Sequence, residues 1–333
     1  MSQAAAAAPP VADQDPSAKR FRLSSGWVGA AMLAVIVLPC VSSLPWTLGA
    51  YDAQNLGDAA SGGGAYAGPS WSEPMGTDAL GRSLLARCLL GGALSLAIGV
   101  AAASIALCIG VTWGALAGYF GGRVDATMMR IVDVVYGLPY ILMVVLLDLA
   151  LSPVFEMIAL WLGEKRPILK WEGWNEATSA QIADIITLLV AIGGVSWLTM
   201  ARVIRGQVLS LRAQPFIEAT AAMGMRTYRV FLHHLLPNLV GPIVVYATLA
   251  VPQAILQESF LSFLGIGVRP PLPSWGNLAA EGVQELPGIA VPGLELYWWL
   301  LVWPCVLLGV TLLGLNFVGD ALRDRFDPKG KNR

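Results

Sequence analysis

Residues 214–238 read QPFIEATAAMGMRTYRVFLHHLLPN, a polar and basic stretch that lies between two long apolar runs. Pro215 suits the first turn of a helix, because its missing N–H would have no partner there anyway. Glu218 lies in the same turn, where the positive end of the helix dipole favours a carboxylate. Gly224 readily takes the left-handed conformation that ends a helix. The stretch therefore predicts a short helix over 215–223, then a turn and a second basic segment that leads into the next apolar run.

The composition of the whole chain indicates a membrane protein. Of its 333 residues, 56% are hydrophobic and 13% are charged, whereas about 25% are charged in an ordinary soluble domain. The mean hydropathy is +0.64. Apolar residues at this density, arranged in long blocks without charge, are typical of membrane-spanning helices. The net charge of −1 gives no reason to expect nucleic acid as a partner.

Six apolar runs are each long enough to cross a bilayer as a helix. They cover approximately residues 27–48, 88–122, 134–151, 182–201, 239–264 and 296–319. The first run is long for a signal peptide and has no small-x-small cleavage site directly after it, so we expect it to remain as a span. The sequence therefore predicts an all-α membrane protein with six transmembrane helices.

The segments between the runs are polar or rich in glycine and proline. We expect a short amphipathic helix at 76–92, a short polar connection at 123–133, and a loop at 152–181 with one interfacial helix. The predicted organisation is a disordered tail at 1–25, the first transmembrane helix and its loop at 26–90, a five-helix transmembrane domain at 91–319 that includes the loop 202–238, and a second tail at 320–333.

The distribution of basic residues predicts the orientation. With six spans, both termini, the 123–133 connection and the 202–238 loop share one side of the membrane, and 15 of the 21 Lys and Arg residues fall there. Positive charge marks the cytoplasmic side of membrane proteins. We therefore expect both termini and the 214–238 stretch in the cytoplasm, and the loops at 50–75, 152–181 and 265–295 outside it.

Glycine recurs every four residues in the second apolar run, at Gly110, Gly114, Gly118 and Gly122. This spacing places small residues on one face of a helix, where a second helix can approach closely. The alternative is that these glycines reflect only the high glycine content of membrane helices.

Residue patterns typical of catalysis or of a metal site are absent from the sequence. The only histidines are His233 and His234, which are adjacent and so point to different faces of a helix. HExxH, GxSxG, CxxC and the phosphate-binding GxxxxGK[ST] do not occur. We therefore predict no catalytic residue, no metal site and no cofactor bound by this chain.

Three carboxylates lie near the ends of spans, at Asp148, Asp184 and Glu258. A carboxylate at membrane depth is costly and suggests a functional site. One interpretation is a polar lining of a translocation path, and the other is an ordinary charge at the membrane–water boundary. The sequence has no relay of charges in mid-span, which argues against a proton-driven transporter.

The opening stretch carries a resemblance to a known family. Glu218-Ala219-Thr220, Gly224 and Leu236-Pro237 have the spacing of the EAA motif of binding-protein-dependent ABC importer permeases. The sequence departs from the general motif at Thr220, which replaces alanine, and at His234, which replaces isoleucine. The ending HHLLPN resembles the peptide-importer branch.

Further blocks resemble the same branch, namely GTDALGRSLLAR at 76–87, LAGYFGGRVDATMMRIVDVVYGLP at 116–139, SFLSFLGIGVRPPLPSWG at 259–276 and GDALRDRFDP at 319–328. The chain is thus similar to the C-type inner-membrane permease subunit of dipeptide and oligopeptide ABC importers. The resemblance implies the type I importer permease fold, also called MetI-like.

The resemblance also implies a role for the opening stretch, as a coupling helix that lies in a groove of a cytoplasmic ATPase. Apolar anchors separated by small residues suit such a groove, and flanking charges suit its rim. The predicted ATPase-coupling residues are Phe216, Ile217, Glu218, Ala219, Thr220, Ala222, Met223, Gly224, Arg226 and Pro237. We expect Phe216, Ile217 and Met223 to be exposed. The alternative is a solvated basic loop that only follows the charge rule.

The partners implied by the resemblance are a B-type permease subunit in a heterodimer, two cytoplasmic ATPase subunits and an extracytoplasmic solute-binding protein. The chain itself would bind no cofactor, while ATP and Mg would be used by the ATPase subunits. The expected location is the bacterial cytoplasmic (inner) membrane, and the expected cargo is a di- or oligopeptide. Nickel or another small solute remains an alternative within this class, and a stand-alone secondary transporter or channel is an alternative outside it.

Overall fold

The computed structural model describes residues 16–55, 57, 64–165, 176–286 and 297–326. In this part of the chain every regular element is a helix, and strand-like pairing is limited to two isolated bridges, Gln54 with Arg82 and Thr77 with Ser83. The helices are α1 (Pro16–Ser42), α2 (Leu44–Ala50), α3 (Leu84–Phe120), α4 (Gly122–Tyr136), α5 (Tyr140–Lys165), α6 (Glu176–Arg212), α7 (Pro215–Ala222), α8 (Thr227–Val230), a π-helical turn (Phe231–Leu235), α9 (Leu236–Phe263), α10 (Trp275–Gln284) and α11 (Trp299–Phe326).

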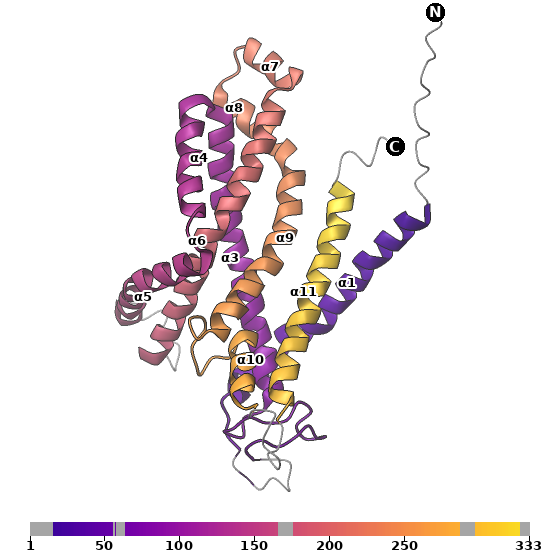
Figure 1. The fold of residues 1–333 in the computed structure, drawn as a ribbon, viewed down its shortest axis with the longest axis vertical. Coiled ribbons are helices and arrows are strands. Elements are labelled where there is room, and N and C mark those ends of the chain that lie inside the picture. Colours follow the sequence, from indigo (N-terminus) through magenta and orange to yellow (C-terminus); the bar gives the residue numbers. More distant parts are fainter. Residues whose placement is uncertain (1–15, 56, 58–63, 166–175, 287–296, 327–333) are drawn as a thin grey trace, which may run out of the picture.

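Six helical segments are long and apolar enough to cross a membrane, which confirms the predicted all-α fold with six spans. They are Ser25–Ser42, Leu84–Phe120, Tyr140–Trp161, Ala180–Arg212, Tyr228–Phe263 and Trp299–Arg325. Figure 1 shows these helices as an elongated bundle with two distinct ends. Helices α7 and α8 lie at one end, toward which the first turns of α1 and the last turns of α11 are directed, and α10 and residues 64–83 lie at the other. We refer to these ends as the α7 end and the α10 end.

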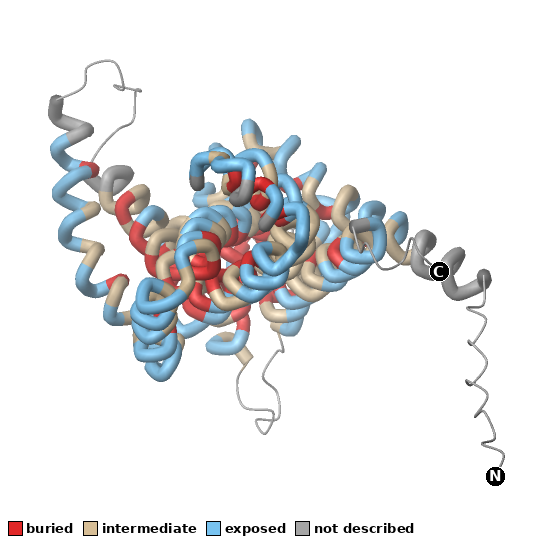
Figure 2. Tube along the Cα trace, turned by 90° about the horizontal axis from the view of Figure 1, so that it is seen from above, coloured by how far each residue is buried: buried red, intermediate tan, exposed pale blue. Residues whose placement is uncertain are grey.

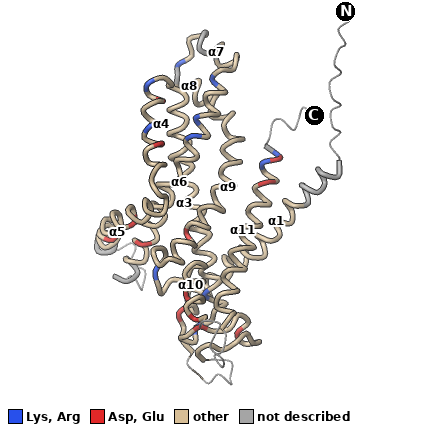
Figure 3. Tube along the Cα trace, viewed as in Figure 1, with Lys and Arg blue, Asp and Glu red and all other residues tan. Residues whose placement is uncertain are grey.

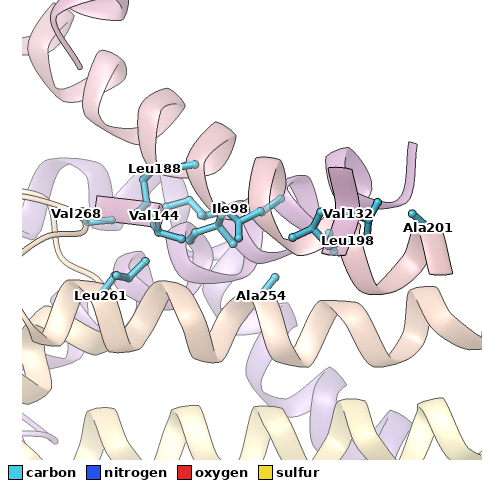
Figure 4. Packing of buried hydrophobic residues seen from close by; sticks show 14 residues of the cluster. Ile98, Val132, Val144, Leu188, Leu198, Ala201, Ala254, Leu261 and Val268 are labelled. Atoms are coloured by element: carbon cyan, nitrogen blue, oxygen red, sulfur yellow. The ribbon is translucent and has the colours of Figure 1, made fainter. Parts of the chain in front are cut away.

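The main core lies where α3, α6 and α9 meet. Ile98 of α3, Leu188 of α6 and Leu261 of α9 are buried together there, and α4 and α5 contribute Val132 and Val144 (Figure 4). Seen from above the bundle, buried residues concentrate near its centre, while the outward faces of the helices are exposed (Figure 2). Exposed leucine and valine on those outer faces are expected for helices that contact lipid.

Glycine allows α3 and α6 to pack backbone to backbone. A Cβ added at Gly110 would meet the Met200 side chain at 2.5 Å, and one added at Gly118 would meet Val208 at 2.9 Å. At Gly114 the added atom would collide with the carbonyl oxygen of Ala201. The predicted glycine seam is therefore confirmed for these three residues, and its partner is α6.

Gly122 does not belong to this seam. Its φ is +54°, a Cβ there would meet nothing within 4 Å, and it begins α4 rather than continuing α3. Gly121 also has a positive φ, of +65°. Two consecutive residues with positive φ turn the chain from α3 into α4 here. Both are glycine because this conformation is costly for residues that have a side chain.

A second close contact pairs α1 with α11. A Cβ at Gly29 would meet the carbonyl oxygen of Gly314 at 2.7 Å, and the two helices run side by side in Figure 1. Helix α1 begins at Pro16, so residues 16–25, predicted as a disordered tail, are helical. The predicted 27–48 span is divided at Ser43, where α1 ends and α2 follows.

The region of the third span differs most from the prediction. The expected polar connection at 123–133 is the 15-residue helix α4, and a break at Gly137-Leu138-Pro139 separates it from α5. Proline has no N–H and disfavours helix at the residue before it, which explains the break. The predicted 152–181 loop is mostly helical, since α5 continues to Lys165 and α6 begins at Glu176; residues 166–175 lie outside the described residues.

Three further boundaries differ from the prediction. Residues 76–83 form turns and bridges rather than the start of an amphipathic helix, so α3 begins only at Leu84. The fifth span begins near Tyr228, not at 239, because α8 and the π-helical turn lead into α9 without interruption. Helix α11 continues to Phe326, so residues 320–326 of the predicted C-terminal tail are helical.

The α3–α6 seam predicts opposite effects for two Gly→Ala substitutions. Gly114→Ala should destabilise the protein by about 1–3 kcal/mol, because the new methyl group meets backbone that cannot rotate away. Gly206→Ala is the matched control: Gly206 lies on α6 with open space beside it, so alanine should be neutral or stabilise the helix by up to about 1 kcal/mol.

The measurement is the temperature at which the detergent-solubilised protein loses its helical circular dichroism. We expect this temperature to fall for Gly114→Ala only. An equal or higher melting temperature for Gly114→Ala would contradict the close packing of the seam.

Candidate functional site

The 214–238 stretch forms a helical hairpin at the α7 end, built on the last turns of α3 and α6. Helix α6 ends at Arg212, whose Nη1 donates to the carbonyl oxygen of Tyr119 on α3 at 2.8 Å. The chain then turns at Gln214, whose N–H donates to the carbonyl oxygen of Leu211 at 3.0 Å. Pro215 begins α7, as predicted. The direction of α7 is thus set by α3 and α6 together.

The end of α7 is a glycine cap. Gly224 has φ +71°, and the N–H of Met225 donates to the carbonyl oxygen of Thr220 at 3.2 Å. This is the six-residue hydrogen bond of a Schellman motif, in which the left-handed residue is usually glycine. The prediction that Gly224 takes the left-handed conformation and ends this helix is confirmed. The cap reverses the chain into α8.

One face of α7 is buried and holds the helix in place. Ile217 is 5% exposed and packs with Val230 and Leu235 in a small cluster, against which Tyr119 and Leu211 also pack. Thr220 is buried beside it, and its hydroxyl donates to the carbonyl oxygen of Ile217 at 2.7 Å. The sequence prediction that Ile217 is an exposed anchor is therefore wrong. A short helix beside a long apolar run must bury one face, and Ile217 fills that position.

A neighbouring face of α7 presents apolar side chains to the outside. Phe216 is 44% exposed and Met223 is 73% exposed, and Ala219 between them is also exposed. Tyr228, at the start of α8, is a further exposed apolar residue in the hairpin, at 51%. We call Phe216, Ala219 and Met223 the outer face of α7. Sequence reasoning missed Tyr228, although its place one turn beyond the glycine cap is a usable signal.

The remaining predicted coupling residues lie in α7, in the turn after it and at the start of α9. Arg226 is exposed in the turn after Gly224, and Pro237 is exposed in the first turn of α9. The backbone of Glu218 and Ala222 is helical, but their side chains lie outside the described part of the structure. The π-helical turn at Phe231–Leu235 lies between the hairpin and α9, and such turns often occur at functional sites.

Two of the three predicted path carboxylates lie close to one cation. Asp184 on α6 pairs with Arg269, in the segment after α9, at 3.4 Å. Asp148 on α5 is buried and experiences the charges of both Arg269 and Asp184. The structure therefore brings Asp148 and Asp184 together at the junction of α5 and α6, although the sequence places them 36 residues apart. Whether they line a path stays a prediction.

Glu258 has a different environment, enclosed by serine hydroxyls with no exposed surface. Its carboxylate accepts from the hydroxyls of Ser262 at 2.8 Å and Ser259 at 3.2 Å, and Ser95 and Ser274 lie close enough to interact with it. These serines connect α3, α9 and the start of α10. The path-lining interpretation is therefore not supported for Glu258 in this conformation. The structure indicates instead that this carboxylate fixes α10 against the bundle.

A second ionic network at the α10 end was not anticipated from the sequence. Arg87 is 1% exposed, and its guanidinium donates to Asp78 at 2.7 Å and to both oxygens of Glu281, at 2.7 and 2.9 Å. Near it the Tyr66 hydroxyl donates to Glu285 at 2.6 Å, a bond that raises the pKa of Tyr66 to about 12. These contacts fasten the 64–83 segment to α10. Glu281 and Glu285 lie 194 and 219 residues from their partners Arg87 and Tyr66, which hid these links, whereas Asp78 is only nine residues from Arg87.

In the described residues, histidine, cysteine, aspartate and glutamate do not gather in groups of three or more that could hold a metal ion. The cysteines are all free, with Cys40 and Cys88 buried and Cys108 and Cys305 exposed. The chemistry available at the α7 end is that of a binding surface: apolar side chains around a small residue, with Arg226 and Arg229 exposed nearby.

Comparison with known proteins finds a matching family and similar sequences. The family model described as "Binding-protein-dependent transport system inner membrane component" matches residues 110–332, well over half of the chain. The dipeptide transport system permease protein DppC of Bacillus subtilis (strain 168) is 41% identical over 239 residues, which are 72% of this chain and 63% of that protein.

Two oligopeptide transport system permease proteins, both named OppC, are similarly related. The protein of Bacillus subtilis (strain 168) is 39% identical over 72% of this chain and 66% of its own length. The protein of Escherichia coli (strain K12) is 39% identical over 73% of this chain and 68% of its own length. The matched part thus spans about two thirds of these relatives. The matched residues include the α3–α6 seam and the whole α7 hairpin, and the chain belongs to the family of binding-protein-dependent transport system inner membrane components.

Proposed function

We propose that this chain is a permease subunit of an ABC importer, and that α7 is the helix through which a separate ATPase subunit moves it. One observation carries the proposal: α7 is anchored on one face by Ile217 and presents Phe216 and Met223 on a neighbouring face. An exposed apolar face beside an anchored one suits binding of a partner.

The position of α7 supports a partner outside the lipid. Helix α6 has 37 residues, about 55 Å at 1.5 Å per residue, whereas the hydrocarbon core is about 30 Å thick. The end of α6 that carries α7 also carries Arg202, Arg205 and Arg212. Figure 3 shows charged residues on α4 and α6 at this end of the bundle. Charged side chains there favour the membrane surface, where a soluble ATPase can bind.

The proposed orientation follows the distribution of basic residues in the sequence. The α7 end and both termini would face the cytoplasm, and the α10 end would face outward in a bacterial inner membrane. There α10 and the 64–83 segment would meet a solute-binding protein. This chain would bind no cofactor, since ATP and Mg would be used by two ATPase subunits.

The proposed cargo is a di- or oligopeptide, because the similar proteins are named as dipeptide and oligopeptide permeases. The path would form between this chain and a second, B-type permease. Asp148 and Asp184 are the candidates for its polar lining within this chain, since they lie together beside Arg269. Uptake of nickel in place of peptide by the reconstituted importer would identify the alternative cargo class.

The outer face of α7 predicts a loss of coupling on truncation. Phe216→Ala combined with Met223→Ala should reduce binding-protein-stimulated ATPase activity about tenfold or more, because removing two anchors costs more than about 1.4 kcal/mol of contact. Leu38→Ala is the control, since Leu38 is similarly exposed, at 65%, but lies on α1. The measurement is ATP hydrolysis by the reconstituted complex with loaded binding protein. Unchanged stimulation in the double variant would contradict the proposed contact.

The glycine cap predicts a distinction between two substitutions at one position. Gly224→Pro should abolish stimulated ATPase activity, because proline cannot adopt φ +71° and α7 would lose its orientation. Gly224→Asn should retain most of the activity, because asparagine tolerates the left-handed conformation. Both variants should insert into the membrane at wild-type levels, as judged by immunoblot. Equal activity of the two variants would show that the conformation of Gly224 is not needed.

The orientation predicts which residues an impermeant thiol reagent reaches in intact cells. In a chain whose four native cysteines are replaced by serine, Trp71→Cys should be labelled from outside and Arg226→Cys should be labelled only after permeabilisation. Both positions are exposed in the structure, so accessibility should report only the side of the membrane. Labelling of Arg226→Cys alone in intact cells would reverse the proposed topology.

A further inference from the structure

Two ion pairs join α4 to α6, in addition to the contact of Val132 with the main core. Helix α4 buries a single residue completely, Val132, and most of its surface is exposed. The side chain of Arg205 on α6 makes a two-pronged ion pair with Asp125 on α4: Nε donates to one carboxylate oxygen, and Nη2 donates to the other at 2.6 Å. Arg202 donates to Asp133 at 2.8 Å and lies over the Tyr136 ring, 4.1 Å from its centroid.

The two pairs differ in strength. The Asp125 side chain is 13% exposed and the Arg205 side chain 35%, while Arg202 and Asp133 are 38% and 66% exposed. A bidentate, partly buried Arg–carboxylate pair fixes geometry, whereas an exposed single bond contributes little. Arg205–Asp125 is therefore the main link between α4 and α6, and Arg202–Asp133 supports it.

Arg205 occupies a junction of three helices. Its backbone carbonyl lies 3.0 Å from a Cβ built at Gly118, so α3 contacts α6 at this residue. Its side chain holds α4. About two helical turns further along, at Arg212, α6 ends and the turn to α7 begins. When a displacement of α7 moves the end of α6, the part of α6 around Arg205 and its contacts with α3 and α4 must also shift.

Beyond α4 the chain leads to α5. The break at Gly137-Leu138-Pro139 leaves α4 and α5 as separate helices, and α5 carries Asp148. Helix α5 runs outward at the side of the bundle in Figure 1, and Tyr140 at its start donates to Gln257 of α9 at 2.7 Å. Helix α5 is attached to the α7 end of the chain both along α6 and through α4.

We propose that Arg205 and Asp125 are positioning residues that transmit the movement of α7 through α4 to α5. In this arrangement α7 and α6 form the arm moved by the ATPase, the Arg205–Asp125 pair connects that arm to α4, and α4 moves the beginning of α5 near the candidate path. The inference rests on the proposed function, and it adds a second route besides α6 itself.

The test uses the complete importer in proteoliposomes, with cognate ATPases, the second permease and loaded binding protein. Two quantities are measured for each variant: stimulated ATP hydrolysis and peptide uptake. Asp125→Arg should lower peptide uptake about tenfold, a change within the usual range of coupling between two sites. ATP hydrolysis should stay within about twofold of wild type. The exchanged pair, Asp125→Arg with Arg205→Asp, should restore most of the uptake.

Arg130→Asp is the matched control, because Arg130 is exposed on the same helix and takes part in neither pair. It should leave both quantities unchanged. Asp125→Asn is the milder variant: where Asp125→Arg fails to accumulate in the membrane, Asp125→Asn should still lower uptake more than hydrolysis. A simple structural role would lower both together, in proportion to the amount of folded protein.

Unchanged uptake in Asp125→Arg, or a parallel loss of uptake and hydrolysis without rescue by the exchanged pair, would overturn the inference while the proposed function stands. A wild-type complex in which loaded binding protein does not stimulate hydrolysis would overturn the proposed function, and with it the inference.

Discussion

The arrangement of this molecule depends on the backbone contact between α3 and α6. Gly110, Gly114 and Gly118 have no side chain to separate the helices, so carbonyl groups of α6 lie directly against α3. Close approach multiplies dispersion contacts, which are the main attraction between helices in lipid. The main core then forms along this seam, with α9 packed on it and Val132 and Val144 closing it from α4 and α5.

The hairpin at the α7 end follows from the same contact. Because α3 and α6 end close together, Tyr119 of α3 can accept from Arg212 of α6 and pack against Ile217 of α7. Helix α7 is therefore held by contacts with two membrane helices, α3 and α6, and not by one alone. This attachment separates its two faces: the inner face belongs to the bundle, and the outer face is free for a partner. At the opposite end Arg87 of α3 fastens α10 through Glu281, and the Trp275 indole at the start of α10 donates to the carbonyl oxygen of Cys88 on α3.

Much of the fold follows from local rules, while the remainder depends on contacts between distant residues. Long apolar runs predict six spans, and Pro215 and Gly224 predict the limits of α7 to within one residue. The burial of Ile217 was not predictable in this way, because the 3.6-residue period of so short a helix does not say which face meets the bundle. Tyr119, Val230 and Leu235 decide it.

Helix α4 illustrates a second limit. Its charges, at Arg123, Asp125, Arg130 and Asp133, suggest a connection in water, whereas two of them are neutralised by arginines some 70–80 residues later in the sequence. The same applies to Glu258, whose serine partners come from three separate segments. Charge in a sequence indicates that a partner is needed, and only the fold shows whether that partner is water, another helix or a ligand.

The most direct test of the central claim is photo-crosslinking from the outer face of α7 in the assembled complex. A photoreactive amino acid in place of Met223 should crosslink to an ATPase subunit, and one in place of Leu38 on α1 should not. The account predicts a crosslink from 223 that is identified by mass spectrometry on an ATPase peptide. Crosslinks from 223 that reach only lipid or the second permease would contradict it.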